Sequence, residues 1–194
     1  PNRDDFEAGV NETPKPEYLH DFELGTEYKN QNINLGVNAY LMLYNNQLVL
    51  TGKINDVGAY TRTNIRHSYR SGLEITASAK LLNWVTVHGN ISFSRNKIKN
   101  FTEYIDDYDT NIQEKKFYRQ TDISFSPNII SSATIECEPA KNWLIALTGK
   151  FMSRQYLDNT SNKNRSLNPY YTQDVNLSYQ VTKKPFKELT VFVQ

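Results

Sequence analysis

Apolar and polar residues alternate along most of this chain, and this period of two constrains the fold more than any other feature. From residue 33 the odd positions read Ile, Leu, Val, Ala, Leu and Leu, whereas the even positions read Asn, Gly, Asn, Tyr, Met and Tyr. Successive side chains of a β-strand point to opposite faces, so such a segment is a strand with one apolar and one polar face. Eight segments show this pattern: residues 18–28, 33–44, 69–80, 85–94, 128–137, 143–154, 171–181 and 189–194. The sequence therefore predicts an all-β chain, an antiparallel up-and-down meander of about eight long strands.

The lengths of the strands and of their connections are typical of a membrane barrel. The clearest segments alternate over about 11–13 residues, which suits a tilted strand that crosses a bilayer and exceeds the usual strand of a soluble sheet. Short turns at 29–33, 81–84, 138–142 and 182–188 alternate with long polar segments at 45–62, 95–120 and 155–170. Bacterial outer-membrane barrels have short periplasmic turns and longer extracellular loops. We therefore expect the three long segments to lie together at the extracellular end.

The amino-acid composition agrees with a membrane barrel whose strands face lipid on one side and water on the other. The 194 residues are 38% hydrophobic with a mean hydropathy of -0.65, and no run of about 18–20 apolar residues could form a membrane-spanning helix. Strands with one apolar and one polar face keep the average hydropathy this low. The net charge of +1 gives no basis for binding nucleic acid, which calls for a basic surface.

The chain lacks the residue patterns of an enzyme or a metal protein. Its one cysteine, Cys137, excludes an internal disulfide and a cysteine-based zinc site. His20, His67 and His88 are far apart in the sequence and have no neighbour at metal-ligand spacing. No Gly-x-Ser-x-Gly elbow and no glycine-rich phosphate loop occurs. The sequence therefore predicts no catalytic residues, no cofactor and no metal site.

Aromatic residues gather near the predicted strand ends, as in the two interfacial girdles of a membrane barrel. Near the short turns lie Tyr28, Trp84 and Trp143; near the long segments lie Tyr40, Tyr44, Tyr69, Tyr156, Tyr170 and Tyr171. The alternative is that aromatic residues simply favour strands.

Charged residues on the polar faces favour a water-filled or plugged lumen over a dry core. Arg70, Glu74, Lys150 and Arg154 are predicted to face the lumen and to contact a plug or one another. A soluble sheet with one wet face would also accept these charges, and it stays open as an alternative.

Three stretches together resemble the TonB-dependent outer-membrane receptors of the type common in Bacteroidetes. Residues 16–44 read PEYLHDFELGTEYK, a short Asn-rich turn and INLGVNAYLMLY, which is similar to a strand pair of that family. Residues 68–75, SYRSGLEI, resemble the strand that re-enters the membrane after an extracellular loop, and the opening residues PNRDDF resemble part of a strand and loop. The resemblance extends over essentially the whole chain.

The resemblance implies a 22-stranded barrel in the bacterial outer membrane with a plug domain inside it. Residues 1–194 then form a partial barrel domain from the C-terminal third, without the plug and the terminal strand. The implied function is active import of a scarce nutrient, foremost a ferric siderophore, energised by TonB with ExbB and ExbD. The implied partners are outer-membrane lipid, the receptor's own plug, the TonB system and the nutrient.

Substrate contacts are expected in the long segments. Segment 95–120 carries a cluster of carboxylates and phenols, Tyr104, Asp106, Asp107, Tyr108 and Asp109, that could engage a cation or simply be solvated. The other two segments carry basic residues that could attract an anionic chelate or lipopolysaccharide phosphates, foremost Arg62, Arg66, Lys163 and Arg165. Lys53 and Arg154 accompany these groups, with Asp56 and Asp158 as acidic neighbours.

Two other classes of protein fit parts of the pattern. A passive porin or another outer-membrane barrel, such as a barrel enzyme or adhesin, would share the alternating strands. A soluble glycan-binding β-sandwich would also alternate, but its apolar strand residues would be buried against each other. That last alternative predicts a dry core containing Leu35, Leu73, Ile145 and Leu147.

Overall fold

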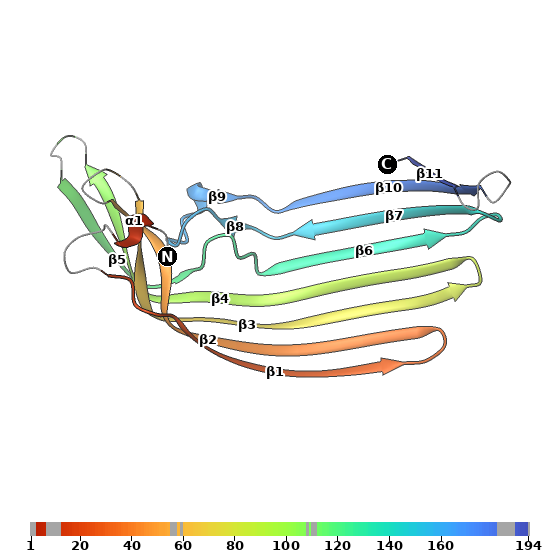
Figure 1. Cartoon of the computed structure of the whole chain (residues 1–194), viewed down its shortest axis with the longest axis horizontal. Helices are drawn as coiled ribbons and strands as arrows, with labels where there is room; N and C mark the ends of the chain where they lie inside the picture. Colours follow the sequence, from red (N-terminus) through yellow and green to blue (C-terminus); the bar gives the residue numbers. More distant parts are fainter. Residues whose placement is uncertain are drawn as a thin grey trace.

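A computed structural model describes residues 3–6, 13–54, 58, 60–107, 109, 112–181 and 189–193, and all structural statements concern these residues. Most of them belong to one antiparallel sheet (Figure 1). In chain order the elements are α1 (Arg3–Phe6), β1 (Tyr18–Lys29), β2 (Ile33–Ile54), β3 (Tyr60–Leu82), β4 (Val85–Asp107), β5 (Ile112–Asp122), β6 (Ile129–Cys137), β7 (Trp143–Met152), β8 (Gln155–Tyr156), the 3-10 turn η1 (Lys163–Arg165), β9 (Ser166–Leu167), β10 (Tyr170–Val181) and β11 (Leu189–Val193).

The sheet confirms the predicted meander. Its strand order is β1-β2-β3-β4-β6-β7-β10-β11, so each of the eight predicted strands lies beside its neighbours in the sequence. The described short turns lie together at one end of the sheet, and the long connections lie at the other (Figure 1). The predicted turn at 182–188 lies outside the described residues.

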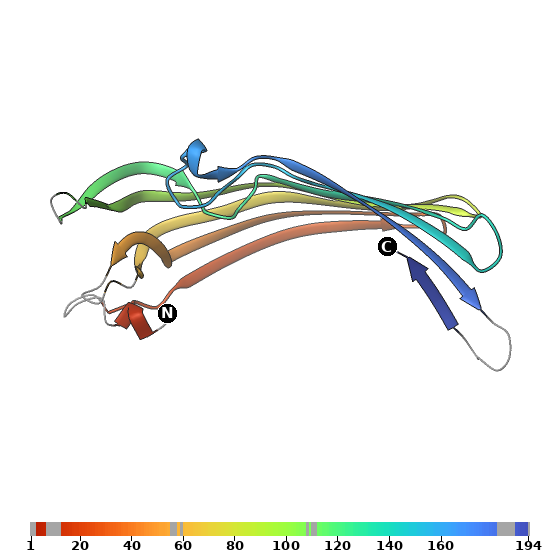
Figure 2. The ribbon, with the colours of Figure 1, turned by 90° about the horizontal axis from the view of Figure 1, so that it is seen from above.

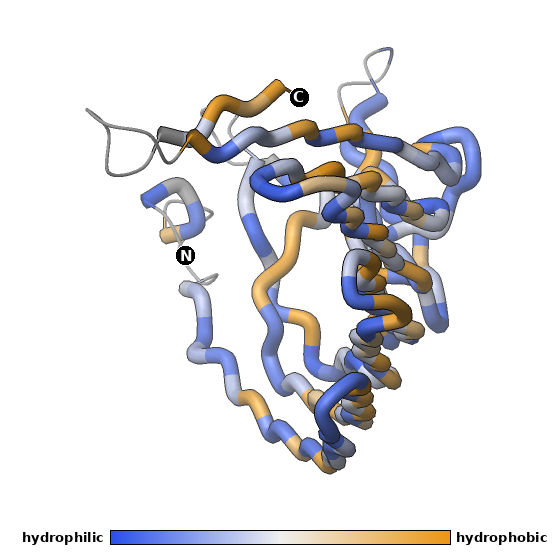
Figure 3. Tube along the Cα trace, turned by 90° about the vertical axis from the view of Figure 1, so that its right-hand side faces the viewer, coloured by the Kyte–Doolittle hydropathy of each residue, from blue (hydrophilic) through white to orange (hydrophobic). Residues whose placement is uncertain are grey.

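The two faces of the sheet separate apolar from polar side chains, because the strands pair in matching register. Val37 lies opposite Ile75, which lies opposite Ile91, whereas on the other face Asn38 lies opposite Glu74. Figure 3 shows that the sheet is curved, with its apolar residues mostly toward the convex side and α1 on the concave side. We call these the convex and the concave face. The convex face is the one that the alternation predicts to contact lipid.

No second layer among the described residues covers the convex face. Leu35 is 41% exposed, and Leu73 and Ile145 are both 37% exposed. These are residues that a sandwich would bury in its core. The geometry therefore contradicts the glycan-binding sandwich.

The prediction that residues 45–62 and 95–120 are loops was wrong. β2, β3 and β4 extend through most of these segments, and β5 is an additional strand that pairs with the far part of β4. The sequence pattern did not reveal them because only a few of their side chains pack into a core and most contact water, so the clear alternation of apolar and polar residues is lost. Segment 155–170 does remain mostly irregular, with only the two-residue strands β8 and β9 and the turn η1.

The sheet divides at the level of His67. Below this level β3 pairs with β4, and above it β3 pairs only with β2, while β4 pairs with β5. Asn46 and Asn100 lie next to this level and have positive φ angles of 60° and 56°, a conformation that Asn tolerates better than most residues. The two hairpins then follow different directions (Figure 2). We call residues 46–54, 60–66, 98–107, 112–127 and 153–169 the extensions.

A small hydrophobic core holds the extensions together. It consists of Val49 from β2, Ile65 from β3, Ile98 and Phe101 from β4, and Ile123, with Tyr118 of β5 packed against it. Ile98 and Phe101 are at most 1% exposed. This closed core lies at the end of the sheet where the long connections gather.

The predicted aromatic girdles are only partly correct. Tyr28, Tyr69, Tyr171 and Trp143 lie on the convex face, and the Trp143 ring contacts that of Tyr179 at 4.7 Å between centroids. Tyr40, Tyr44 and Tyr170 instead occupy concave-face positions, because they fall on the other parity of their strands. Trp84 lies in a turn and Tyr156 lies in β8 of the extensions.

Helices contribute little to the described structure. α1 has four residues, and no helix in the described part of the chain is long and apolar enough to cross a membrane.

Candidate functional site

Basic residues from three segments surround a cavity in the extensions. Its volume is about 480 Å³, and its charged lining residues are Lys15, Lys53, Arg62 and Arg66, with Tyr104 beside them. Thr13, Pro14, Asn46, Thr63 and Asn64 complete the lining. We call this the basic cavity. The structure thus brings the predicted basic residues of segment 45–62 together with Tyr104 of segment 95–120 and with Lys15, which the sequence analysis did not select.

Strand alternation and one asparagine place the basic side chains. Arg62, Asn64 and Arg66 occupy alternate positions of β3, so they share a face, which continues the concave face below. The Asn64 side chain fixes the segment that precedes β1. Its Oδ1 accepts a hydrogen bond from the Lys15 amide at 2.7 Å, and its Nδ2 donates to the carbonyls of Lys15 at 3.0 Å and Asn46 at 2.7 Å. Lys15 is thereby held beside the two arginines.

Tyr104 of β4 provides an aromatic wall. The Nζ of Lys53 lies 5.9 Å from the centroid of its ring, and the Nζ of Lys115 lies 5.6 Å away, within the range of cation–π attraction. Gly52 makes this approach possible. It has a φ of 83°, and a side chain at this position would collide with the Tyr104 carbonyl.

The charge of the basic cavity is only partly balanced. Arg62 forms an ion pair with Asp5 of α1, with Nη1 3.3 Å from Oδ2, and its backbone amide donates to the same carboxylate at 2.8 Å. Arg66 is exposed and forms no ion pair with any described residue. Asp56, the acidic neighbour noted in the sequence, lies outside the described residues. A cavity of this kind attracts carboxylate, phenolate or phosphate groups at short range.

The predicted acidic cluster lies at the tip of the β4–β5 hairpin. The Asp106 carboxylate accepts a hydrogen bond from Nε2 of Gln113 at 2.6 Å, and that of Asp107 accepts one from the Asp109 amide at 2.9 Å. Tyr108 lies outside the described residues. In the described part of the chain, no group of three or more His, Cys, Asp and Glu side chains could hold a metal ion. These carboxylates thus stabilise the hairpin, and substrate contact by them stays a prediction.

The predicted basic residue Arg165 takes part in an ionic network around the buried carboxylate of Glu103. Its Nη2 lies 2.6 Å from Oε1 of Glu103, and its Nη1 lies 3.0 Å from Oδ2 of Asp158. The Tyr118 hydroxyl donates to Oε2 of Glu103 at 2.7 Å. Burial and then this hydrogen bond to Glu103 raise the pKa of Tyr118 to about 12. Burial lowers the pKa of Arg165, but Glu103 and Asp158 more than compensate, so it remains charged.

Further hydrogen bonds tie residues 156–161 to the strands. Asn159 is 3% exposed; its Oδ1 accepts from the Ser124 amide at 2.8 Å and its Nδ2 donates to the Leu50 carbonyl at 3.1 Å. The Ser161 hydroxyl donates to Asp122 at 2.8 Å, and Asp122 also pairs with Lys97 at 2.5 Å. In the sequence, Glu103 and Asn159 look like ordinary loop residues, so nothing marked them as structural. Lys163 lies in η1 and is exposed.

Tyr104 also lines a second cavity, of about 390 Å³, on the side of the ionic network. Asp106 and Arg165 lie in its lining, together with Glu103 and Asp158. Predicted residues from all three long segments therefore gather around Tyr104, which connects the two cavities.

Comparison with known proteins identifies the chain. Residues 3–194 match the family described as TonB dependent receptor-like, beta-barrel. The chain belongs to this family. Membership places it in the bacterial outer membrane, in agreement with the convex apolar face. No curated protein matches the chain.

Solved receptor structures share its fold at low sequence identity. The siderophore receptor PiuA from Acinetobacter baumannii aligns with a TM-score of 0.65 and 14% identity over 87% of this chain and 23% of its own. The copper transporter OprC aligns with a TM-score of 0.66 and 13% identity over 95% of this chain and 26% of its own. The ferric yersiniabactin uptake receptor FyuA from Yersinia pestis aligns with a TM-score of 0.60 and 17% identity over 84% of this chain and 22% of its own. The chain thus spans about a quarter of the length of these proteins.

The concave face of this TonB-dependent receptor barrel carries most of the residues predicted to face a lumen. Arg70 donates to the Ser126 hydroxyl at 3.0 Å, and Lys150 pairs with Asp174 at 3.3 Å. Glu74 borders a hollow beside Gly25, Glu27 and Gly36. Arg154 follows β7 and donates to Ser166 at 2.7 Å. Contact of these four residues with a plug stays a prediction.

Proposed function

We propose that this chain forms part of the barrel of an active-transport receptor that imports an iron chelate, and that its basic cavity contacts the anionic groups of that chelate. The observation that carries the proposal is the basic cavity at the end of the sheet where the long connections lie. That end faces the cell exterior in outer-membrane barrels. A solute would therefore meet the cavity before it entered the lumen.

The chemistry of the cavity suits an anionic chelate. Iron chelators bind the metal through deprotonated oxygen groups, so many complexes carry negative charge. Lys15, Lys53, Arg62 and Arg66 supply several cationic donors, and the Tyr104 ring adds a flat apolar surface. Two of the similar structures are named for a siderophore or its ferric complex, which supports iron chelates as the ligand class. OprC is named for copper, so a different metal complex is the first alternative.

In this proposal the chain has no enzymatic role, and residues 1–194 form a partial barrel domain of a larger receptor. Arg70, Glu74, Lys150 and Arg154 contact the plug that fills the lumen. TonB, with ExbB and ExbD, supplies the energy through parts of the receptor other than this chain. Lys163, Arg165 and the acidic residues Asp106, Asp107 and Asp109 then contribute to the rim of the site, and substrate contact by Tyr108 stays a prediction.

The decisive experiment changes the charge of the basic cavity. Lys15→Gln combined with Arg66→Gln removes two cationic side chains whose loss breaks no described ion pair. Uptake of radioactive iron is measured in cells that produce the receptor, with a panel of anionic and neutral ferric chelates. We expect the half-saturating concentration of the anionic chelates to rise about tenfold, in line with one charge-assisted contact. Unchanged uptake of every anionic chelate would contradict the proposal.

Two controls complete the experiment. Lys141→Gln removes one charge from a short turn at the opposite end of the sheet and should leave uptake unaltered. Deletion of TonB should abolish saturable uptake through the receptor, because transport is proposed to be energised. Uptake that continues without TonB and does not saturate would instead indicate a passive porin.

A further inference from the structure

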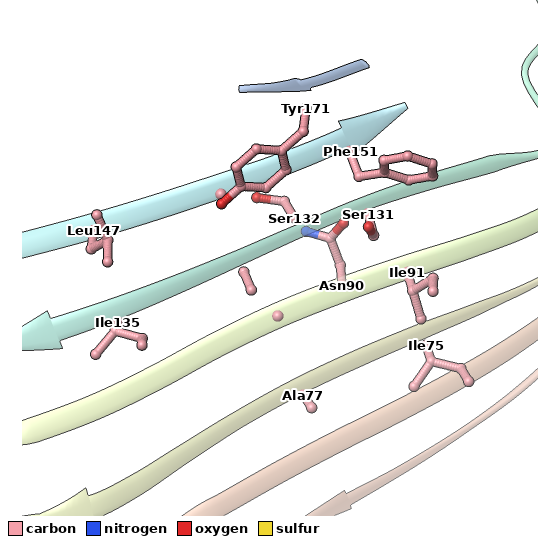
Figure 4. A pocket seen from close by; sticks show the side chains of 13 residues that line it. Ile75, Ala77, Asn90, Ile91, Ser131, Ser132, Ile135, Leu147, Phe151 and Tyr171 are labelled. Carbon is pink, nitrogen blue, oxygen red and sulfur yellow. The ribbon is translucent and has the colours of Figure 1, made fainter. Parts of the chain in front are cut away.

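A trough crosses the convex face of the sheet. Ala77, Gly89, Ala133 and Gly149 lie opposite one another in β3, β4, β6 and β7, so four adjacent strands present only small side chains at one level. Ile75, Ile91 and Phe151 form one wall of the trough, and Ile135 and Leu147 form the other (Figure 4). Its volume is about 520 Å³.

Tyr171 of β10 closes one end of the trough. Figure 4 shows its ring lying across β7, where Gly149 leaves room that any side chain would fill. Tyr171 lies opposite Phe151, toward the end of the sheet with the long connections. The trough is therefore open on the side of β3 and β4 and closed by aromatic rings on the side of β7 and β10.

The position of the trough on the membrane face determines what fills it. The lining is mostly apolar, and its polar residues are Asn90, Ser131, Ser132 and, at the closed end, Tyr171. Water therefore finds few polar partners in the trough. The surrounding convex face contacts lipid hydrocarbon, and the trough is continuous with it. A flexible hydrocarbon chain can enter such a depression and gain contacts that a flat surface does not offer.

A basic surface lies above the trough on the same face. Along β4, Ile91 and Phe93 are followed at the same parity by Arg95, Lys97 and Lys99. Arg95 is four residues beyond Ile91, about 13 Å along the strand. Arg95 and Lys99 are exposed and form no ion pair with the residues that the structure describes, whereas Lys97 pairs with Asp122. Apolar trough and cationic surface together match an amphiphile with an anionic head group.

We propose that the convex face of β3, β4, β6 and β7 binds one molecule of lipid A, the phosphorylated lipid of the outer leaflet. One acyl chain lies in the trough, and a phosphate group lies against Arg95 and Lys99. The assignment to lipid A follows from orientation: the two cations lie on the side of the long connections, which is the extracellular side of an outer-membrane barrel.

The test uses the whole receptor, purified from outer membranes in detergent and stripped of lipid. Lipid A or phosphatidylglycerol is added, and native mass spectrometry counts the bound molecules. Arg95→Gln combined with Lys99→Gln removes the phosphate contacts; we expect lipid A affinity to fall about twenty-fivefold, which is about fivefold for each charge. Gly89→Val combined with Ala133→Val fills the trough. A Cβ at position 89 would meet only an ordinary contact at 3.6 Å, and we expect a loss of at least about fivefold.

Matched controls separate specific binding from general effects. Lys141→Gln removes a charge from the opposite membrane side, and Ala39→Val enlarges an exposed convex-face residue outside the trough; neither should alter lipid A binding. Heat-modifiable migration on a gel verifies that each variant is folded. If Gly89→Val/Ala133→Val impairs folding, the lipid A affinity of Arg95→Gln/Lys99→Gln decides whether the site binds lipid A. Unchanged lipid A affinity in Arg95→Gln/Lys99→Gln would overturn the proposal. So would wild-type affinity for phosphatidylglycerol that equals or exceeds that for lipid A.

Discussion

The same three strands, β2, β3 and β4, serve in two regions whose apolar residues behave in opposite ways. In the membrane region, below the level of His67, apolar side chains stay exposed, as with Leu35 at 41% and Phe93 at 43%. In the extensions, a few apolar side chains are fully enclosed, as with Ile98 at 0% and Phe101 at 1%. The difference shows that the solvent around each region determines where the apolar side chains go. Lipid replaces the core in one region, and the protein has to build its own core in the other.

Polar interactions differ between the regions in the same way. On the concave face of the membrane region, Lys150 and Asp174 form a partly exposed ion pair across two strands, which contributes little to stability. In the extensions, the Glu103 side chain is 7% exposed and is bonded to both Arg165 and Tyr118. A buried carboxylate that loses its partners costs several times more than an exposed one. The extensions therefore depend on specific contacts, whereas the membrane region depends on its backbone ladder and its two contrasting faces.

The largest expected effect is in the small core. Phe101→Ala should destabilise the extensions by about 3–5 kcal/mol, since it removes a fully buried ring and leaves a cavity. Hydrogen exchange measured by mass spectrometry on the receptor would show faster exchange in β5 and in residues 156–161.

Phe93→Ala makes the same substitution in the membrane region, eight residues before Phe101 in β4, and is compared with Phe101→Ala. Phe93 faces lipid, which can fill the space left by the ring, so we expect little change in exchange of either region. Equal effects of the two substitutions would mean that the membrane region has a protein core after all.

A charge placed on each face of the membrane region tests the assignment of the faces. Leu73→Arg puts a cation on the convex face and should reduce the folding stability by about 2–4 kcal/mol if it lies near the bilayer midplane. Thr76→Arg puts the same side chain on the concave face and should cost less than about 1 kcal/mol. Denaturant titration of the receptor in lipid vesicles compares the two. A greater loss for Thr76→Arg would reverse the assignment of lipid and lumen.

The comparison of regions also explains which parts of the structure could be predicted. All eight membrane strands were correct, because a strand between lipid and water has to alternate and the alternation is visible in residues such as Ile33 to Tyr44. The upper parts of β2 to β4 and the whole of β5 were missed, because most of their side chains are polar and in contact with water, as in loops, and only a few pack into the small core. Tyr40 and Tyr44 were wrongly predicted to belong to an aromatic girdle. They lie near a strand end, but their even positions in β2 place them on the concave face.

The candidate site was predictable in kind but not in arrangement. Arg62 and Arg66 were selected as basic residues of one segment, and they do line one cavity. Lys15 and Tyr104 reach the same cavity from distant positions, through strand pairing that the sequence pattern did not predict. Arg165 was selected for its charge, yet Glu103 and Asp158 hold it in a network. Charge alone does not distinguish an arginine that meets a ligand from one that meets a buried carboxylate.

The smallest effect concerns the pH dependence of the ionic network. The pKa of Tyr118 is raised from about 10 to about 12 in the folded state, so folding favours the protonated phenol. Its contribution is complete below pH 10, the value of an unfolded tyrosine, and is lost as the pH rises toward 12. Tyr118→Phe should destabilise the extensions by about 1 kcal/mol at neutral pH through loss of the hydrogen bond to Glu103.

This difference between wild type and Tyr118→Phe should shrink between pH 10 and 12, because only the wild type loses stability there. Ultraviolet absorbance of tyrosinate, taken as wild type minus variant, should show one group that titrates near 12. Hydrogen exchange of β5, with rates corrected for the intrinsic effect of pH, measures the stability difference. A difference between wild type and variant that stays constant up to pH 12 would show that the Tyr118 phenol ionises with its ordinary pKa, and that Glu103 is held by Arg165 alone.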